Sequence, residues 1–199
     1  MGDNGIPYPS GVARSLLRFP LLLYRLGLGG LANAAHILIL TTQGRTTGLP
    51  RHTPIEYRQH GSKVYVISAW GTQPHWVRNL LANPQVTIQM GRRRFSARAE
   101  LIANPGEALR VLHLFRRRAP VIYDALIARM SAREKVTART MPEVTDRFTI
   151  VRFLPLPDAG SPAPLPMNLI WVWPALLLAG TTVTVLVTLA RTRRTDDDE

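Results

Sequence analysis

The stretch that decides the fold is residues 36–70, which read HILILTTQGRTTGLPRHTPIEYRQHGSKVYVISAW. Apolar and polar residues alternate in HILILTT, HTPIEYR and KVYVISAW, and β-branched residues are frequent there, as is typical of strands. The connections between these segments contain glycine and are too short to hold a crossover helix, so neighbouring strands are expected to run antiparallel. The stretch therefore predicts the first part of an antiparallel sheet.

Further strands and helices continue this pattern downstream. The predicted strands are QVTIQM at 85–90, FSARAELI at 95–102 and FTIVRFL at 148–154. The predicted helices are HWVRNLLAN at 75–83, NPGEALRVLHLFRRR at 104–118 and PVIYDALIARM at 120–130. Six strands with short connections and a few helices predict a mainly antiparallel β-barrel over residues 34–154.

The composition bounds the classes of function. The 199 residues are 46% apolar and include no cysteine, which excludes a disordered chain, disulfides, iron–sulfur clusters and cysteine-bound zinc. Residues 1–99 hold twelve basic residues and two acids, so an anionic partner is expected for this half. Nucleic acid is not expected as a partner, because no binding motif is present and only two of the 25 basic residues are lysine.

The connection between the first two strands, QGRTTGLPR at 43–51, has an unusual composition. It carries two glycines and two arginines and contains no acid. Glycines let backbone N–H groups converge, Thr46 and Thr47 offer hydroxyl donors, and Arg45 and Arg51 can hold a phosphate or carboxylate with two bonds each. The loop can therefore bind an anion, although a solvated hairpin loop has a similar composition.

Three segments of the barrel resemble a known family. The segments ILILTTQGRTTGLPRHTPIEY, VYVISAWG and PHWVRNLLANPQVTIQMGRRRFSARAELI resemble the deazaflavin-dependent nitroreductases of actinobacteria, a family that includes quinone reductases. The GRxTG and PxWxxNLxANPxV motifs lie about 30 residues apart in the family's order, and the resemblance covers about residues 15–154. It implies a split β-barrel like that of flavin reductases and pyridoxamine-phosphate oxidases. It also implies an oxidoreductase that transfers hydride from reduced coenzyme F-420 to a quinone, nitro compound or similar acceptor.

The resemblance also implies a set of cofactor-binding residues. The anionic tail of the deazaflavin would be held by Arg45, Thr46, Thr47, Gly48 and Arg51. The ring would lie along Ser68, Ala69, Trp70 and Gly71. Trp76 and Asn79 match the segment after the ring site, where the indole can pack and the amide can fix the loop by hydrogen bonds. For Trp76, a core aromatic that supports the helix is the other interpretation.

The chain departs from the family's pattern at one position of the loop. Thr46 stands where many members carry lysine, so one cation facing the tail is missing. FMN is therefore the second choice of cofactor. The alternative function is a non-catalytic protein that binds a flavin, haem or lipid in the same barrel.

Catalytic and metal-binding side chains are not evident in the sequence. Tyr123 could gate the acceptor or donate a proton, but a packing tyrosine is the more frequent case. The histidines lack the spacing of metal ligands, so no metal site is expected. Glu56 is expected to form a salt bridge to a neighbouring arginine. Hydride transfer needs no such groups, because the cofactor carries the chemistry and the protein supplies orientation and shielding.

Residues 1–33 form a basic amphipathic segment. On a helix, Arg14, Arg18 and Arg25 share one face, opposite four leucines at 16, 17, 23 and 26. The segment could lie in the interface of an anionic membrane or pack its leucines on the barrel, and Pro20 argues against one unbroken helix. It is not expected to be a signal peptide, since arginines interrupt the apolar run.

The C-terminal residues predict a membrane anchor. Residues 155–168 contain five prolines and predict an extended tether with nothing to pack. Residues 169–190 lack charge and would span about 33 Å as a helix, enough for a bilayer core of about 30 Å, and a charged tail follows at 191–199. Small residues at 180, 184 and 188 could pair two such helices into a homodimer.

The anchor leads to predictions of acceptor and location. A lipid-soluble quinone such as menaquinone is the expected acceptor, because the anchor concentrates the enzyme where that substrate dissolves. We expect a single-pass protein of the cell membrane with its barrel facing the cytoplasm. Arginines after the span argue for the opposite orientation by the positive-inside rule, but moving a nine-residue tail across the membrane is the smaller task.

Overall fold

In a computed structural model of the chain, the structure describes residues 11–118, 123, 148–157 and 160–177. The predicted helix at 120–130, apart from Tyr123, lies outside the described residues, as do residues 178–190 of the predicted span and the tail at 191–199. Of that span, residues 172–177 are described as helical. Within the described ranges, none of the helices has the length and apolar character needed to cross a membrane.

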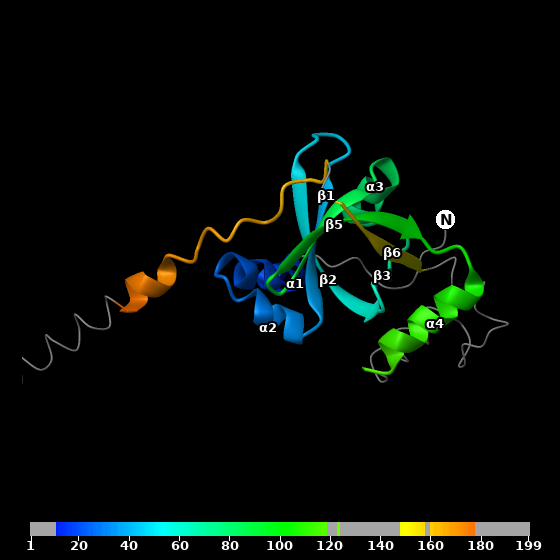
Figure 1. Cartoon of the computed structure of the whole chain (residues 1–199), viewed down its shortest axis with the longest axis horizontal. Coiled ribbons are helices and arrows are strands. Elements are labelled where there is room, and N and C mark those ends of the chain that lie inside the picture. Colours follow the sequence, from blue (N-terminus) through cyan, green and yellow to red (C-terminus); the bar gives the residue numbers. More distant parts are fainter. Residues whose placement is uncertain (1–10, 119–122, 124–147, 158–159, 178–199) are drawn as a thin grey trace, which may run out of the picture.

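Six antiparallel strands close into a barrel in the order β1, β2, β3, β6, β5, β4 (Figure 1). Their bounds are β1 Ile37–Gln43, β2 Pro50–His60, β3 Lys63–Ser68, β4 Gln85–Met90, β5 Arg93–Leu101 and β6 Thr149–Leu156. All neighbouring strands are antiparallel, and β1 closes the barrel by pairing with both β2 and β4. The prediction of a mainly antiparallel barrel is confirmed.

The loop between β1 and β2 is shorter than predicted. The two strands pair from Ile37 opposite Glu56 to Gln43 opposite Pro50, which leaves only residues 44–49 outside the ladder. Pro50 is accommodated because it is the first residue of β2, where a missing backbone N–H costs little. Arg51 therefore lies on a strand, and its position is fixed by the sheet.

Alternating residues of the strands fill the barrel. The interior cluster includes Leu38, Leu40, Val64, Val66, Val86, Ile88, Val151 and Phe153. Two helices pack on the barrel. Helix α3 (His75–Ala82) follows β3 and adds Leu80 to the interior cluster. Helix α4 (Pro105–Arg116) packs apolar residues such as Val111, Leu112 and Phe115 beside Tyr65 and Ile150. Helix α3 and the helix expected at 104–118 are thus confirmed, with the second ending slightly earlier.

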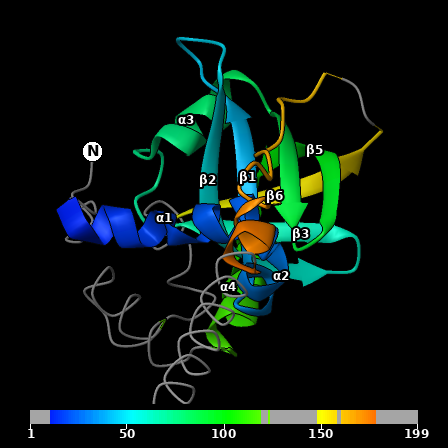
Figure 2. The ribbon, with the colours of Figure 1, turned by 90° about the vertical axis from the view of Figure 1, so that its left-hand side faces the viewer.

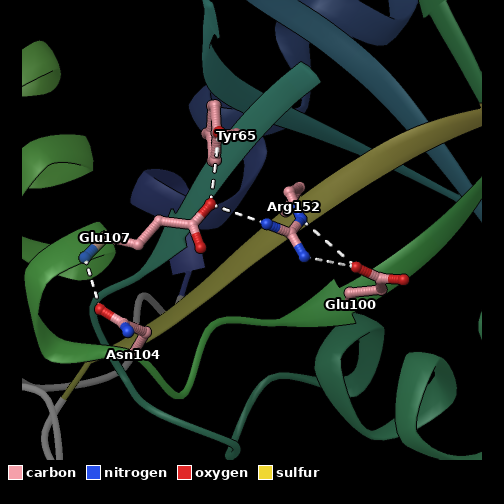
Figure 3. A network of polar contacts seen from close by, with 5 residues as sticks. All are labelled: Tyr65, Glu100, Asn104, Glu107 and Arg152. Atoms are coloured by element: carbon pink, nitrogen blue, oxygen red, sulfur yellow. Dashed lines mark hydrogen bonds and ion pairs between the residues drawn. The ribbon is translucent and has the colours of Figure 1, made fainter. Parts of the chain in front are cut away.

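A polar network fixes the start of α4 to the barrel (Figure 3). Asn104 caps the helix by accepting a hydrogen bond from the backbone N–H of Glu107 at 3.0 Å. The Glu107 carboxylate accepts from Arg152 of β6 at 2.8 Å and from the Tyr65 hydroxyl of β3 at 3.4 Å. Arg152 also donates to Glu100 of β5 at 2.7 Å. One guanidinium thus joins two carboxylates of the same chain, and the network holds α4 in place.

Helix α1 (Gly11–Arg25) runs unbroken through Pro20, so the expectation of a break is wrong. Pro20 is itself buried in this helix, although it lacks the N–H of a normal backbone hydrogen bond. Tyr24, only 3% exposed, donates its hydroxyl to the carbonyls of Ile37 and Gln89 at 3.2 and 3.1 Å and accepts from the Gly91 N–H at 2.9 Å. The end of α1 is thereby fixed to β1 and to the β4–β5 turn.

Only part of the apolar face of α1 packs on the barrel. Leu21 and Leu23 lie against a cluster that contains Tyr24 and Ile39. In contrast, exposed apolar side chains continue along α1 at Leu16, Leu17, Phe19 and Leu22. The packing interpretation therefore holds for the last turns of α1 but not for Leu16 and Leu17. A short helix, α2 (Gly29–Ala34), follows and adds Ala32 to the same cluster.

The expectation that the proline-rich segment has nothing to pack is wrong. Residues 160–169, here called the strap, lie against the barrel and α1. Leu165 is 9% exposed and belongs to the cluster with Tyr24 and Ile39. The Thr87 hydroxyl donates to the Pro162 carbonyl at 2.5 Å, and the Gln89 side chain binds the backbone of Leu165. Polar side chains of β4 supply partners that a proline-rich backbone cannot find within itself.

Candidate functional site

A cavity of about 610 Å³ opens between α1, the 44–49 loop, β2 and α3. We call it the basic pocket. Figure 2 shows α3 toward the upper end of β2 and α1 toward its lower end, with the 44–49 loop projecting at the α3 end of the barrel. Its lining residues are Arg18, Leu21, Arg25, Gly44, Arg45, Thr46, Thr47, Pro50, Arg51, His52, Thr53, His75, Trp76, Asn79 and Leu165. The arginine- and threonine-containing loop thus forms part of the wall of a cavity.

The 44–49 loop is tightly folded and depends on its glycines. The Gly44 N–H donates to the Leu49 carbonyl at 2.9 Å, and the Gly48 N–H donates to the Gly44 carbonyl at 2.7 Å. A side chain at Gly44 would meet the Thr47 hydroxyl oxygen at 2.9 Å, and Gly48 has a φ of 68°, which favours glycine. The loop therefore presents its threonines and arginine from a compact backbone.

Asn79 of α3 fixes the loop at Arg45. Its amide is buried, and Oδ1 accepts from both the backbone N–H and Nη1 of Arg45 at 3.3 Å. Its Nδ2 donates to the Thr42 hydroxyl of β1 at 3.1 Å. The expectation that this amide fixes the loop by hydrogen bonds is confirmed. Arg45 is thereby held at the cavity by a neutral acceptor, so its charge is not cancelled.

Arg51 reaches the loop from β2. Its Nη2 lies 3.5 Å from the Thr47 hydroxyl, which also accepts from the Leu49 N–H at 3.4 Å. The Thr47 oxygen is again a neutral partner. Arg45 and Arg51 therefore approach the cavity from the loop and from the adjoining strand.

Helix α1 adds two cations that the sequence analysis did not assign to the site. Arg18 and Arg25 both line the basic pocket. The Arg25 Nε donates to the Asn168 side-chain oxygen of the strap at 2.8 Å. Among the described residues that line the cavity there is no Asp or Glu. Four guanidinium groups around one cavity favour an anionic ligand, and they offset the lysine that Thr46 replaces.

Two histidines and one indole complete the wall. His52 lies 3.0 Å from the Thr41 hydroxyl through Nδ1, and burial lowers the pKa of its imidazole. His75 lies 3.5 Å from Nη1 of Arg45. Trp76 packs against the barrel interior, as the core interpretation expects, and it also lines the cavity. Its contact with a cofactor stays a prediction. Over the ranges that the structure describes, no cluster of three or more potential metal-ligating side chains occurs.

The four residues expected along the cofactor ring do not line this cavity. Ser68 is 2% exposed and donates to the Gly71 carbonyl at 2.7 Å, closing the turn after β3. Ala69 packs toward the apolar cluster beneath α4. Ser68, Ala69, Trp70, Gly71 and the loop residue Gly48 are absent from the lining of the basic pocket. The structure thus brings together the expected tail residues other than Gly48, with Trp76 and Asn79.

Tyr123 also lies away from the basic pocket. It is 7% exposed, its ring lies tilted by 58° beside that of Phe115, and its hydroxyl donates to Glu56 Oε2 at 2.8 Å. Burial, reinforced by the nearby Glu56 carboxylate, raises the pKa of the Tyr123 hydroxyl. Glu56 pairs with Arg58 at 2.6 Å, which confirms its expected salt bridge. These contacts favour the packing interpretation of Tyr123 over a role in proton donation.

Comparison with known proteins agrees with the site. The sequence model of a family described as "F420H(2)-dependent quinone reductase" matches residues 24–136, which is more than half of the chain. An F420H(2)-dependent quinone reductase of Mycobacterium tuberculosis is 34% identical over 97 residues. The match covers 45% of this chain and 64% of the relative, so the chain spans less than two thirds of that protein.

Solved structures with a similar arrangement include an F420-H2 dependent reductase and the haem storage protein HutZ of Vibrio cholerae. The first has a TM-score of 0.45 and 19% identity and covers 59% of this chain and 93% of its own. The second has a TM-score of 0.45 and 19% identity and covers 65% and 88%. The family match includes β1 to β5, the 44–49 loop and α3, which carry most of the basic pocket. By this match, the chain belongs to the F420H(2)-dependent quinone reductase family.

Proposed function

We propose that the protein is an oxidoreductase that uses reduced coenzyme F-420 to reduce a quinone or a similar acceptor. The observation that carries this proposal is the basic pocket, where four arginines line one cavity without a carboxylate among its described lining residues. The family's coenzyme is a deazaflavin with a phosphate and an oligoglutamate tail. A polyanion of this kind matches the charge and the donor set of the pocket.

The residues present fit such a tail. Arg45 and Arg51 would bind phosphate or carboxylate oxygens, while the Thr46 and Thr47 hydroxyls would donate to them. Glycine at position 44, where a side chain would meet the Thr47 oxygen at 2.9 Å, allows the loop its compact fold. Arg18 and Arg25 would add charge from the α1 side. Asn79 would keep Arg45 in position, since its amide bonds both to that residue and to β1.

Apolar side chains of the pocket would shield part of the bound coenzyme. When bound, the reduced deazaflavin supplies the hydride. Leu21, Trp76 and Leu165 line the same cavity as the arginines and would exclude water from part of it. With its lowered pKa, the imidazole of His52 is neutral near pH 7 and can accept or donate one hydrogen bond. The chain's own contribution is binding, orientation and desolvation.

The test is a binding and turnover comparison. Coenzyme F-420 and FMN are titrated against the full chain, and oxidation of reduced coenzyme F-420 is followed with menaquinone as the acceptor. The proposal expects tighter binding of coenzyme F-420 than of FMN, and quinone-dependent oxidation. Binding of FMN, haem or lipid without turnover would instead support the non-catalytic alternative.

We also propose that the protein is anchored in the cell membrane by residues 169–190, with the barrel in the cytoplasm. Its support is the uncharged sequence of that stretch and the exposed apolar side chains on α1 and residues 170–177. The exposed set includes Leu16, Leu17, Phe19, Leu22, Ile170, Trp171, Leu176 and Leu177. The Trp173 indole donates to the Leu26 carbonyl at 2.9 Å, so the C-terminal segment is bonded to the residue that follows α1. Tryptophan and leucine beside arginine are typical of interfacial segments.

Membrane association is tested with vesicles and protoplasts. Leu16→Asp with Leu17→Asp should weaken binding of the chain to vesicles of anionic lipid, whereas Leu81→Asp on α3, an equally exposed leucine, should not. Protease added to intact protoplasts should leave the barrel intact, and digestion from outside would contradict the orientation. Pairing of two copies through residues 180, 184 and 188 is tested by the mass of the detergent-solubilised protein.

A further inference from the structure

The strap contributes directly to the basic pocket. Leu165 lines the cavity, and it is also buried in the cluster that contains Tyr24, Ala32 and Ile39. The strap lies outside the part of the chain that matches the family model, which ends at residue 136. One wall of the pocket therefore comes from a segment that the family match does not include.

Gln89 holds Leu165 by two hydrogen bonds. Its Oε1 accepts from the Leu165 N–H at 2.8 Å, and its Nε2 donates to the Leu165 carbonyl at 3.1 Å. Gln89 is 8% exposed, so both bonds are formed where water has little access. An amide that satisfies both backbone groups of one residue fixes its position much as a neighbouring strand would. Removing this match would leave polar groups buried without partners.

The strap also supports the α1 side of the pocket. The Asn168 side chain accepts from Arg25 Nε at 2.8 Å, and the Leu169 N–H donates to the Arg25 carbonyl at 3.0 Å. Arg25 itself lines the basic pocket. The Gln89 carbonyl accepts from the Tyr24 hydroxyl at 3.1 Å, so β4, α1 and the strap meet around adjacent residues. A displaced strap would release both Leu165 and a support of Arg25.

We propose that the strap is a wall of the ligand site, with Leu165 and Gln89 as positioning residues, and that ligand binding and strap docking stabilise each other. The ligand assignment rests on the proposed function, but the coupling does not depend on which anion binds. If docking of the strap strengthens ligand binding by some factor, the ligand must stabilise the docked strap by the same factor. The C-terminal segment is then part of the binding site as well as its connection to the anchor.

The test uses the full chain with three substitutions. Gln89→Glu keeps the shape of the side chain but removes the donor to the Leu165 carbonyl, and Leu165→Ala shortens the wall while keeping the backbone bonds. Asn104→Ala is the control, because it removes the cap of α4 and contacts neither the strap nor the pocket. Affinities for coenzyme F-420 and for FMN are measured by fluorescence titration. Hydrogen exchange at residues 160–169 is measured with and without each ligand.

The expected result is a loss of affinity of about ten-fold for Gln89→Glu and a smaller loss for Leu165→Ala, with Asn104→Ala unchanged. In the parent protein, ligand should slow exchange in the strap, and Gln89→Glu should remove that protection. Equal affinities in all variants, or strap exchange indifferent to ligand, would overturn the proposal. Strap-dependent binding of FMN alone would support the strap and contradict the proposed coenzyme. Failure of both ligands to bind the parent would overturn both proposals.

Discussion

Arginines have charged partners in one region of the molecule and neutral partners in another. Beneath α4, Arg152 binds the Glu100 and Glu107 carboxylates at 2.7 and 2.8 Å (Figure 3). The hydrogen bond to Glu100 is the main reason that the pKa of Arg152 is raised. In the basic pocket, Arg45 and Arg25 instead bond to the neutral side chains of Asn79 and Asn168.

This difference distinguishes a structural network from the proposed binding site. Where each guanidinium meets carboxylates of the same chain, its charge is already balanced and it serves to fix α4. Where neutral oxygens orient the guanidinium, the position is fixed but the positive potential remains available to a ligand. The pairing of charges, more than their number, is thus our reason for proposing the basic pocket as the functional region.

The largest expected effect comes from removing the charges of the pocket. Arg45→Ala combined with Arg51→Ala should weaken binding of coenzyme F-420 by at least about a hundred-fold, since each charge-assisted bond is worth about 1.5–3 kcal/mol. Fluorescence titration measures the affinity. Arg152→Met is the matched control and should leave binding unchanged. Equal losses in the double variant and the control would show that the two regions do not differ in function.

The second test measures stability in place of ligand affinity. Arg152→Met should lower the free energy of unfolding by about 1–2 kcal/mol, because two partly exposed carboxylates lose their partner. Urea denaturation measures this loss. Arg51→Ala should change stability by less than about 0.5 kcal/mol, since this side chain has a neutral and exposed partner. A larger loss of stability for Arg51→Ala than for Arg152→Met would contradict the distinction between a structural network and a proposed binding site.

A smaller effect is expected from adding a charge to the pocket. Thr46→Lys should tighten binding of coenzyme F-420 by about two- to five-fold, as expected of an additional exposed ion pair. The gain should shrink as salt is added, because exposed charges are screened. Titrations at low and high ionic strength check both statements. Weaker binding of the lysine variant at low salt would argue against an anionic tail at this loop.

The smallest expected effect concerns pH. Burial lowers the pKa of His52 below the value of 6.5 that it has in the unfolded chain. The unfolded state therefore binds the proton more tightly, and stability should fall as the pH drops from about 7.5 through 6.5. His52→Asn should show a shallower loss in urea denaturation across this window. Identical pH profiles would contradict the contribution of His52.

Much of the barrel could be predicted from local patterns. Alternation in HILILTT and QVTIQM indicates strands, and a helix at 75–83 follows from its own spacing. The sequence also predicts that the arginines of α1 share one face. That this face borders the basic pocket depends on how α1 packs on the barrel. The docking of the strap was hidden because its partners, Thr87 and Gln89, lie about 75 residues away. A proline-rich segment without local partners resembles a free linker in sequence alone.

The pairing of β6 has a consequence for how the chain can be divided. Strand β6 pairs with β3 on one side, where Val64 lies opposite Phe153. It pairs with β5 on the other side, where Ser96 lies opposite Leu156. The region that matches the family ends at residue 136, before this strand begins at Thr149. A fragment cut at that limit would leave two strand edges with unused N–H and C=O groups, which favour aggregation. The smallest foldable unit therefore extends beyond the recognisable family segment.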